Sequence, residues 1–360
     1  MTARARVAWT LAGVLCLAAL AFSCSGVRFY SQSIRGQLSI VMRRHSLESV
    51  IADRSVDAEL RAKLEQVLEM REFASQELAL PDNGSYRGFV ELERPFAVWN
   101  VVATPELSVS PVVWCFPVAG CVSYRGYFSR QGAERFARSL VKKGHDTSVE
   151  GVAAYSTLGW FRDPVLSTFI DWDEARLAGL IFHELAHHEV YVKGDTVFNE
   201  SFATAVELEG LERYLGQQGA LTKLEESRRR RERGRRFAGL VLAHRARLET
   251  LFSTASSDDA KRRGKREIFA ALKQGYEELR ASWGDYTGYD AWFARDLNNA
   301  HLASVGAYSE LVPAFEALLE KGGGDLAVFY DRVRGLAELS KNERRAGLKE
   351  AVSPPRPERR

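Results

Sequence analysis

The sequence has little cysteine, no marked excess of charge of either sign and no long apolar run. It contains 50 Lys or Arg against 47 Asp or Glu, and a net charge of +3 gives no reason to expect a nucleic-acid partner. The longest apolar run, residues 7–22, is shorter than the about 20 residues that a membrane-spanning helix needs. No repeat of fixed period is present, which excludes a solenoid. The 360 residues, 46% of them hydrophobic, are typical of a globular protein with one large or two ordinary domains.

The N-terminal residues 1–23 have the three parts of a secretory signal peptide. Two arginines are followed by the uncharged apolar run and then by small residues, Ala21 and Ser23, before Cys24. This pattern resembles a bacterial lipoprotein signal, with Cys24 as the lipidated residue. It predicts export to the bacterial cell envelope, with the protein lipid-anchored to a membrane and facing the periplasm. Ordinary cleavage at the small residues, or an uncleaved N-terminal anchor, are the alternatives.

The four cysteines are accounted for by this arrangement. Cys16 lies inside the signal and Cys24 would carry lipid, which leaves Cys115 and Cys121. These two bracket the segment FPVAG, whose proline and glycine allow the chain to fold back, and an exported protein meets an oxidising compartment. We therefore expect a local disulfide between them, with two buried free thiols as the alternative.

The most specific motif is His-Glu-Leu-Ala-His, from His183 to His187. A spacing of four residues places both imidazoles on one face of a helix, one turn apart. Asp171 is expected to cap this helix, with Glu174 three residues later as in a capping box. A catalytic zinc ion needs three protein ligands and one open position, and Glu184 would take a proton from a water on that ion. The alternative is a pair of core histidines that are hydrogen-bonded to neighbours.

Two downstream glutamates, Glu200 and Glu207, compete to be the third ligand of one Zn²⁺ ion. Glu207 follows His187 at an interval that resembles that of thermolysin. The segment FNESFATAVE, however, resembles the N-E-G-F-A-x-x-x-E signature of aminopeptidase N-type gluzincins, in which the glutamate after asparagine binds zinc. This resemblance favours Glu200, with Thr204 or Glu207 on the same helix face orienting a ligand histidine from behind. His188 points about a third of a turn away from His187 and is expected at the helix surface or behind the ligands.

Several further segments resemble the putative aminopeptidase family of bacterial lipoproteins, which are zinc peptidases by prediction. The segments are FYSQSIRGQL, AGCVSYRGYF, YSTLGWFRDPVLSTFI, FHELAHHEVYVKGDTVFNESFATAVE and NNAHLASVGAYSELVPAFEALL. The resemblance implies a membrane-anchored metallopeptidase that acts on peptide substrates in the periplasm. The G-A-M-E-N element, which binds the substrate amine in aminopeptidase N, is absent here.

Hydrophobic periodicity gives the expected organisation of the chain. Helical spacing covers residues 31–80, β-branched and aromatic residues predict strands in residues 86–127, and short helices are expected at residues 129–144 and 198–210. A further strand and a loop are expected in residues 146–161. Beyond Gly210 the chain is almost wholly helical in pattern, and the basic run 228–236 is typical of a solvated helix face, with contact to anionic lipid as the alternative.

We therefore expect an α+β fold that is mostly helical, with a small antiparallel sheet beside a zincin-type active helix. The expected parts are a signal peptide (1–23), an N-terminal helical and β segment (24–150), a zincin-like catalytic core (151–215), a C-terminal helical segment (216–352) and a disordered tail (353–360).

Two tyrosines are candidates for stabilising the oxyanion of a hydrolytic transition state. Tyr155 lies in GVAAYSTLGWF, about as far upstream of the metal helix as the edge strand that pairs with substrate in gluzincins, and Tyr308 lies in VGAYSEL. A structural aromatic is the alternative for each. The function predicted is a zinc-dependent metallopeptidase, an aminopeptidase by resemblance. The alternatives are a non-catalytic zinc-binding envelope lipoprotein and a cell-wall peptide amidase.

Overall fold

The computed structural model describes residues 24–116, 120–155, 157, 161–284, 286–305 and 311–352, with side chains from Phe29 onward. The predicted signal peptide, the predicted tail and Tyr308 lie outside these residues. The helices are α2 (Cys24–Met42), α3 (Leu47–Ala52), α4 (Ala58–Gln76), α5 (Arg130–Val141), α6 (Glu174–Glu189), α7 (Thr196–Gln217), α8 (Leu221–Ser253), α9 (Asp258–Ala281), α10 (Asp290–Phe293), α11 (Asn299–Val305), α12 (Val312–Glu320), α13 (Leu326–Ala337) and α14 (Lys341–Val352). Among the described residues, no helix is both long and apolar enough to cross a membrane.

The strands are short and form three small sheets. They are β1 (His45–Ser46), β2 (Gly88–Val90), β3 (Val98–Pro105), β4 (Trp114–Phe116), β5 (Gly120–Val122), β6 (Arg125–Tyr127), β7 (His145–Val152) and β8 (Val165–Leu166). The sheet orders are β1-β2-β8, β6-β3-β7 and β4-β5, and every pairing is antiparallel except that of β2 with β8. The mostly helical α+β fold that the sequence predicts is thereby confirmed. Cys115 and Cys121 are paired across the β4-β5 hairpin and joined by a disulfide.

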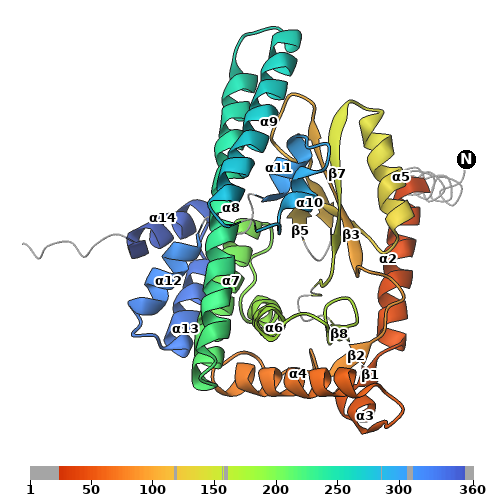
Figure 1. The fold of residues 1–360 in the computed structure, drawn as a ribbon, viewed down its shortest axis with the longest axis vertical. Coiled ribbons are helices and arrows are strands. Elements are labelled where there is room, and N and C mark those ends of the chain that lie inside the picture. Colours follow the sequence, from red (N-terminus) through yellow and green to blue (C-terminus); the bar gives the residue numbers. More distant parts are fainter. Residues whose placement is uncertain are drawn as a thin grey trace, which may run out of the picture.

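The helix α6 lies at the centre of the molecule, with α7 and α8 on one side and α4 below it (Figure 1). Its apolar residues are the reason, since Leu177, Ile181, Phe182 and Leu185 are fully buried. They belong to the largest core cluster, which draws on residues from Ile40 to Leu348. Burying one such side chain contributes on the order of 1.5–3 kcal/mol, so the position of α6 is strongly fixed. The division of the chain into the parts given above remains a prediction.

The helix boundaries correct the sequence reading in two places. Asp173, not Asp171, caps α6, because its Oδ1 accepts a hydrogen bond from the Arg176 backbone amide at 3.0 Å and the helix begins at Glu174. The helix expected over residues 198–210 is longer, since α7 runs from Thr196 to Gln217. Its buried residues continue beyond Gly210 with Leu211, Tyr214 and Leu215, which pack into the core and override the helix-breaking tendency of glycine.

A buried arginine holds the loop between α4 and β2 against α6. Arg71 is fully buried and donates hydrogen bonds to the backbone carbonyls of Pro81, Asn83 and Ser85, at 2.6, 3.2 and 3.1 Å. The side chain of Asn83 lies 2.8 Å from Nδ1 of His188 on α6. The loop is therefore a support for α6, fixed by one guanidinium.

Replacing this arginine should destabilise the fold strongly. Arg71→Met leaves several buried carbonyls without a donor, and we expect it to lower the free energy of unfolding by about 3 kcal/mol. Urea unfolding followed by circular dichroism measures this loss. Arg130→Met is the matched control, because Arg130 is 74% exposed and pairs only along its own helix with Glu134, which predicts less than about 0.5 kcal/mol. Equal effects of the two substitutions would contradict the assignment.

Candidate metal centre

The two histidines of the HELAH motif meet one glutamate of the next helix. His183 and His187 lie one turn apart on α6, and Glu200 lies in the second turn of α7. Oε2 of Glu200 is 3.4 Å from Nε2 of His183 and 3.8 Å from Nε2 of His187. One ligand atom from each of the three residues lies within 4.8 Å of the others, so this group could hold a metal ion. Among the residues that the structure describes, no other cluster of His, Cys, Asp or Glu side chains has this geometry.

The second glutamate, Glu207, lies on the other side of the first histidine. Its Oε2 is 3.1 Å from Nδ1 of His183, while Nε2 of the same ring faces Glu200. A carboxylate at Nδ1 accepts the ring proton and leaves the Nε2 lone pair for a metal, which is the usual arrangement behind a ligand histidine. Thr204 lies near Glu207, and both line one cavity. Among the hydrogen bonds of the described residues, none joins Thr204 to His183 or His187, whereas one joins Glu207 to His183. The geometry therefore pairs His183 with Glu207 rather than with Thr204.

Without a metal, the pKa values of the two imidazoles shift in opposite directions. Burial alone would lower the pKa of His183, but hydrogen bonds to Glu200 and Glu207 raise it to about 10. Burial and the nearby charge of His183 lower the pKa of His187 to about 4. Burial opposes ionisation of Glu200, yet the bond from His183 holds the pKa of this carboxyl below its usual value. In neutral solution the ring of His183 is thus a protonated imidazolium between Glu200 and Glu207, whereas the ring of His187 is neutral.

Metal uptake should displace this proton. Because the pKa of His183 is about 10, the ring is protonated at pH 7.5, and a metal must compete with the proton for Nε2. We expect release of about one proton per zinc ion and an affinity that falls about tenfold for each pH unit below 10. Calorimetric titrations in buffers of different ionisation enthalpy measure the number released. Uptake without proton release would contradict this electrostatic account.

A first cavity of about 740 Å³ opens in front of the centre. His183, Glu184, His187 and Glu200 form one wall, and the end of β7 with the segment that follows forms another. Tyr155 lies in this second wall, but its hydroxyl donates to Oε1 of Gln37 on α2 at 2.5 Å. The candidate oxyanion donor thus lines the cavity while its hydroxyl is bound to α2.

Two other tyrosines, which the sequence analysis did not predict as site residues, line the same cavity as the candidate metal ligands. Tyr124, between β5 and β6, and Tyr191, just after α6, both line the first cavity. Burial and the carboxylate of Glu200 raise the pKa of Tyr124 to about 12, and the same two causes raise that of Tyr191. The Tyr191 ring lies 6.3 Å from that of His187, between centroids. Both hydroxyls therefore stay protonated at neutral pH.

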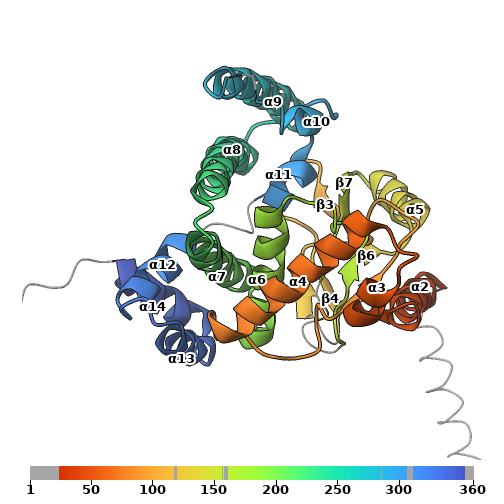
Figure 2. The ribbon, with the colours of Figure 1, turned by 60° about the horizontal axis from the view of Figure 1, so that its bottom comes forward.

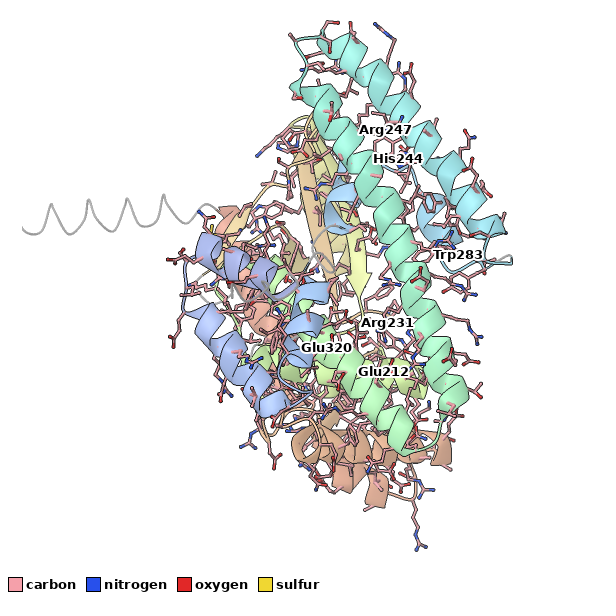
Figure 3. All side chains as sticks on the ribbon, turned by 90° about the vertical axis from the view of Figure 1, so that its left-hand side faces the viewer. Glu212, Arg231, His244, Arg247, Trp283 and Glu320 are labelled. Carbon is pink, nitrogen blue, oxygen red and sulfur yellow. A yellow bond between two sulfur atoms is a disulfide. The ribbon has the colours of Figure 1, made fainter. Side chains whose placement is uncertain are left out.

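A second cavity of about 790 Å³ lies on the other side of His183 and Glu184. It shares Trp172, Leu180, His183 and Glu184 with the first cavity, so the centre stands between the two. The long helix α8 lines this cavity with three residues of its basic run, Arg230, Arg231 and Arg235. Figure 3 shows Arg231 on α8 near Glu212 of α7, and Nη2 of Arg231 is 3.6 Å from Oε1 of Glu212. The two cavities give space for substrate on both sides of Glu184.

His188 turns away from the metal ligands and is buried. Its Nδ1 faces Asn83, and its Nε2 lies 3.6 Å from Oδ2 of Asp163, whose side chain is 5% exposed. Asp163 also accepts hydrogen bonds from the amide and hydroxyl of Thr157, at 2.9 and 2.7 Å. His188 is therefore a residue behind the ligands, joined to the segment that follows β7, and not a helix-surface residue.

Comparison with known proteins gives one match. The sequence model of a family described as putative aminopeptidase matches residues 28–348, which include every residue of the centre. None of the curated proteins and none of the solved structures compared with the chain matches it.

Proposed function

The chain belongs to the putative aminopeptidase family, and on this basis we propose that it is a zinc-dependent peptidase that removes N-terminal residues from peptides. The observation that carries the zinc dependence is the approach of His183, His187 and Glu200 to within 4.8 Å, with Glu184 between the histidines in the sequence. Two imidazoles and one carboxylate are the ligand set of many catalytic zinc sites, in which a fourth position stays open.

The donors fit zinc in their chemistry as well as in their spacing. Glu207 fixes the ring of His183 so that Nε2 faces Glu200, and burial favours the neutral imidazole of His187 that a metal requires. His183, His187 and Glu200 would hold the ion. When bound, zinc supplies a Lewis acid that polarises a peptide carbonyl and makes water more acidic.

Glu184 is the residue to which we assign proton transfer. It lines both cavities, so a peptide bound in either of them would lie beside its side chain. Glu184 takes a proton from water as the water oxygen bonds to the scissile carbonyl carbon. It then gives that proton to the amide nitrogen as the carbon–nitrogen bond breaks. Tyr124 and Tyr191, whose side chains line the first cavity, are the candidates to donate a hydrogen bond to the developing negative charge on the carbonyl oxygen.

The edge strand β7 offers a place for the peptide backbone. It is an outer strand of the β6-β3-β7 sheet, and its last residue, Val152, lines the first cavity together with Ala153 and Ala154. The carbonyls of Val152 and Ala153 accept bonds from Ala97 N at 2.9 Å and Thr168 Oγ1 at 2.6 Å, which fix the path of this segment. A peptide that adds to a rigid edge gains main-chain hydrogen bonds independently of its sequence.

We also propose that the protein is exported and anchored through a lipid on Cys24. The layout of residues 1–23 supports this location. Labelled fatty acid should be incorporated into the wild-type chain and not into Cys24→Ser when both are expressed in bacteria. Equal labelling would exclude Cys24 as the site.

The activity is tested by digesting a peptide library and reading the products by mass spectrometry. Zinc-loaded protein should shorten peptides from the N-terminus, and the same protein treated with a chelator should leave them intact. Cleavage at internal bonds would replace the aminopeptidase assignment with endopeptidase action, which the two-sided cavity would accommodate. Cleavage of cell-wall peptides alone would indicate an amidase. No cleavage of any substrate by zinc-loaded protein would contradict the proposed function.

A further inference from the structure

The outer face of α2 is a continuous apolar stripe. Tyr30, Ile34, Leu38, Val41 and Met42 are 39, 65, 52, 43 and 76% exposed. At 3.6 residues per turn, these positions share roughly one third of the helix circumference. Single exposed apolar residues are ordinary on a protein surface, but five on one face of one helix form a patch of the kind that contacts a partner.

The opposite face of α2 is fixed against the protein, so the stripe cannot turn inward. Phe29 and Ile40 are buried, and the Phe29 ring contacts that of Tyr127 at 5.5 Å between centroids. Gln32 accepts a hydrogen bond from the Phe128 backbone amide at 3.0 Å. Figures 1 and 2 both place α2 at the outer edge of the molecule, away from α7, α8 and α12.

The sequence before α2 identifies the partner. The uncharged apolar run of residues 7–22 ends two positions before Cys24, the first residue of the helix. This inference rests on the membrane anchor proposed above: with either the apolar run in a membrane or a lipid on Cys24, α2 would start at the bilayer surface. The helix contains no Asp or Glu, and its sequence has Arg28 and Arg35, with Arg43 directly after it. Arg43 is partly exposed and pairs with Glu93, whereas the next residue, Arg44, donates a hydrogen bond to the Gly84 carbonyl and is turned toward the protein. This charge pattern is complementary to anionic lipid headgroups.

We propose that α2 lies in the headgroup layer of an anionic membrane, with the Tyr30–Met42 stripe embedded and Arg35 and Arg43 at the phosphates. Amphipathic helices of this kind bind in the plane of the interface through their apolar face and their basic residues. Phe29, Tyr30, Ser33 and Gln37 also line the first cavity, so this placement brings one wall of that cavity next to the bilayer. Docking would orient the protein as well as retain it.

The test uses residues 24–360 with Cys24→Ser, which contain every described element and carry neither lipid nor the apolar run. Flotation with vesicles of phosphatidylethanolamine and phosphatidylglycerol measures the membrane partition coefficient. The triple change Ile34→Ser, Leu38→Ser and Met42→Ser should lower this coefficient by about tenfold or more, because each removes apolar surface from the interface. The matched control changes three exposed apolar residues elsewhere, Leu221, Val328 and Leu339, to Ser, and it should bind as the parent does.

Three outcomes would overturn the proposal. In the first, the parent protein fails to float with vesicles, and in the second, the stripe variant floats as well as the parent. In the third, the parent sediments as a dimer and the stripe variant as a monomer, which would assign the stripe to contact between copies of the chain. Circular dichroism and zinc uptake, which involve no exposed residue of α2, report whether each variant is folded. The readout does not use peptide hydrolysis, so it is independent of the proposed activity.

Discussion

Glu184→Gln should bind zinc as tightly as the wild-type protein and hydrolyse peptides at least about 10³-fold more slowly, since general acid–base catalysis typically contributes 10²–10⁴-fold. The amide of glutamine keeps the size and hydrogen-bonding capacity of the side chain but cannot accept the proton of water. The three metal-binding residues are untouched, so the loss should appear in kcat rather than in metal content. Initial rates on a fluorogenic peptide, with zinc measured per chain by mass spectrometry, give both quantities.

A glutamate on the same helix provides the control for this substitution. Glu189 lies at the end of α6 and forms an ion pair with Arg334 of α13, away from both cavities. Glu189→Gln makes the same chemical change and should retain wild-type activity. Equal rates for Glu184→Gln and the wild-type protein would exclude Glu184 as the base, whatever the metal content.

Removal of Glu200 should cost more zinc affinity than removal of Glu207. Glu200→Ala takes away one of three ligands, whereas Glu207→Ala removes only the carboxylate behind His183. Loss of such an outer partner typically weakens metal binding 10–100-fold, so we expect about that factor for Glu207→Ala and a loss of more than about 100-fold for Glu200→Ala.

Competition with a chromophoric chelator measures these affinities. The sequence leaves two candidates for the third metal ligand, because Glu207 follows His187 at an interval that resembles that of thermolysin and Glu200 follows an asparagine. The substitution that costs more zinc affinity identifies the ligand. A larger loss for Glu207→Ala would reverse the assignment and place Glu207 on the metal.

The parts of the centre that sequence analysis predicts are those with local signals. His183, Glu184 and His187 follow from a spacing of four on a helix, and the geometry of Glu200 agrees with the context of its segment. The position of Glu207 behind His183 also follows from helix periodicity, because seven residues make about two turns. β-Branched and aromatic residues predict strands in residues 86–127, where β2 to β6 lie, whereas β1, β7 and β8 lie outside that range.

The parts that could not be predicted depend on contacts between distant segments. Tyr124 reaches the centre because the disulfide-linked hairpin and β6 place it there, and Tyr155 turns to Gln37, 118 residues earlier in the chain. The basic run of α8 is mostly exposed, as the sequence predicts, but the sequence does not show that three of its arginines border a cavity, which depends on the packing of α8 against α6 and α7. No local pattern encodes these contacts.

The most direct test of the catalytic zinc centre is a crystal structure of the zinc-soaked protein with anomalous data collected on both sides of the zinc edge. The account predicts one strong peak between Nε2 of His183, Nε2 of His187 and the carboxylate of Glu200, with Glu207 on Nδ1 of His183 and no fourth protein ligand. A peak bound by Glu207 in place of Glu200, an ion closed off by a fourth side chain, or no peak at the two histidines would contradict it.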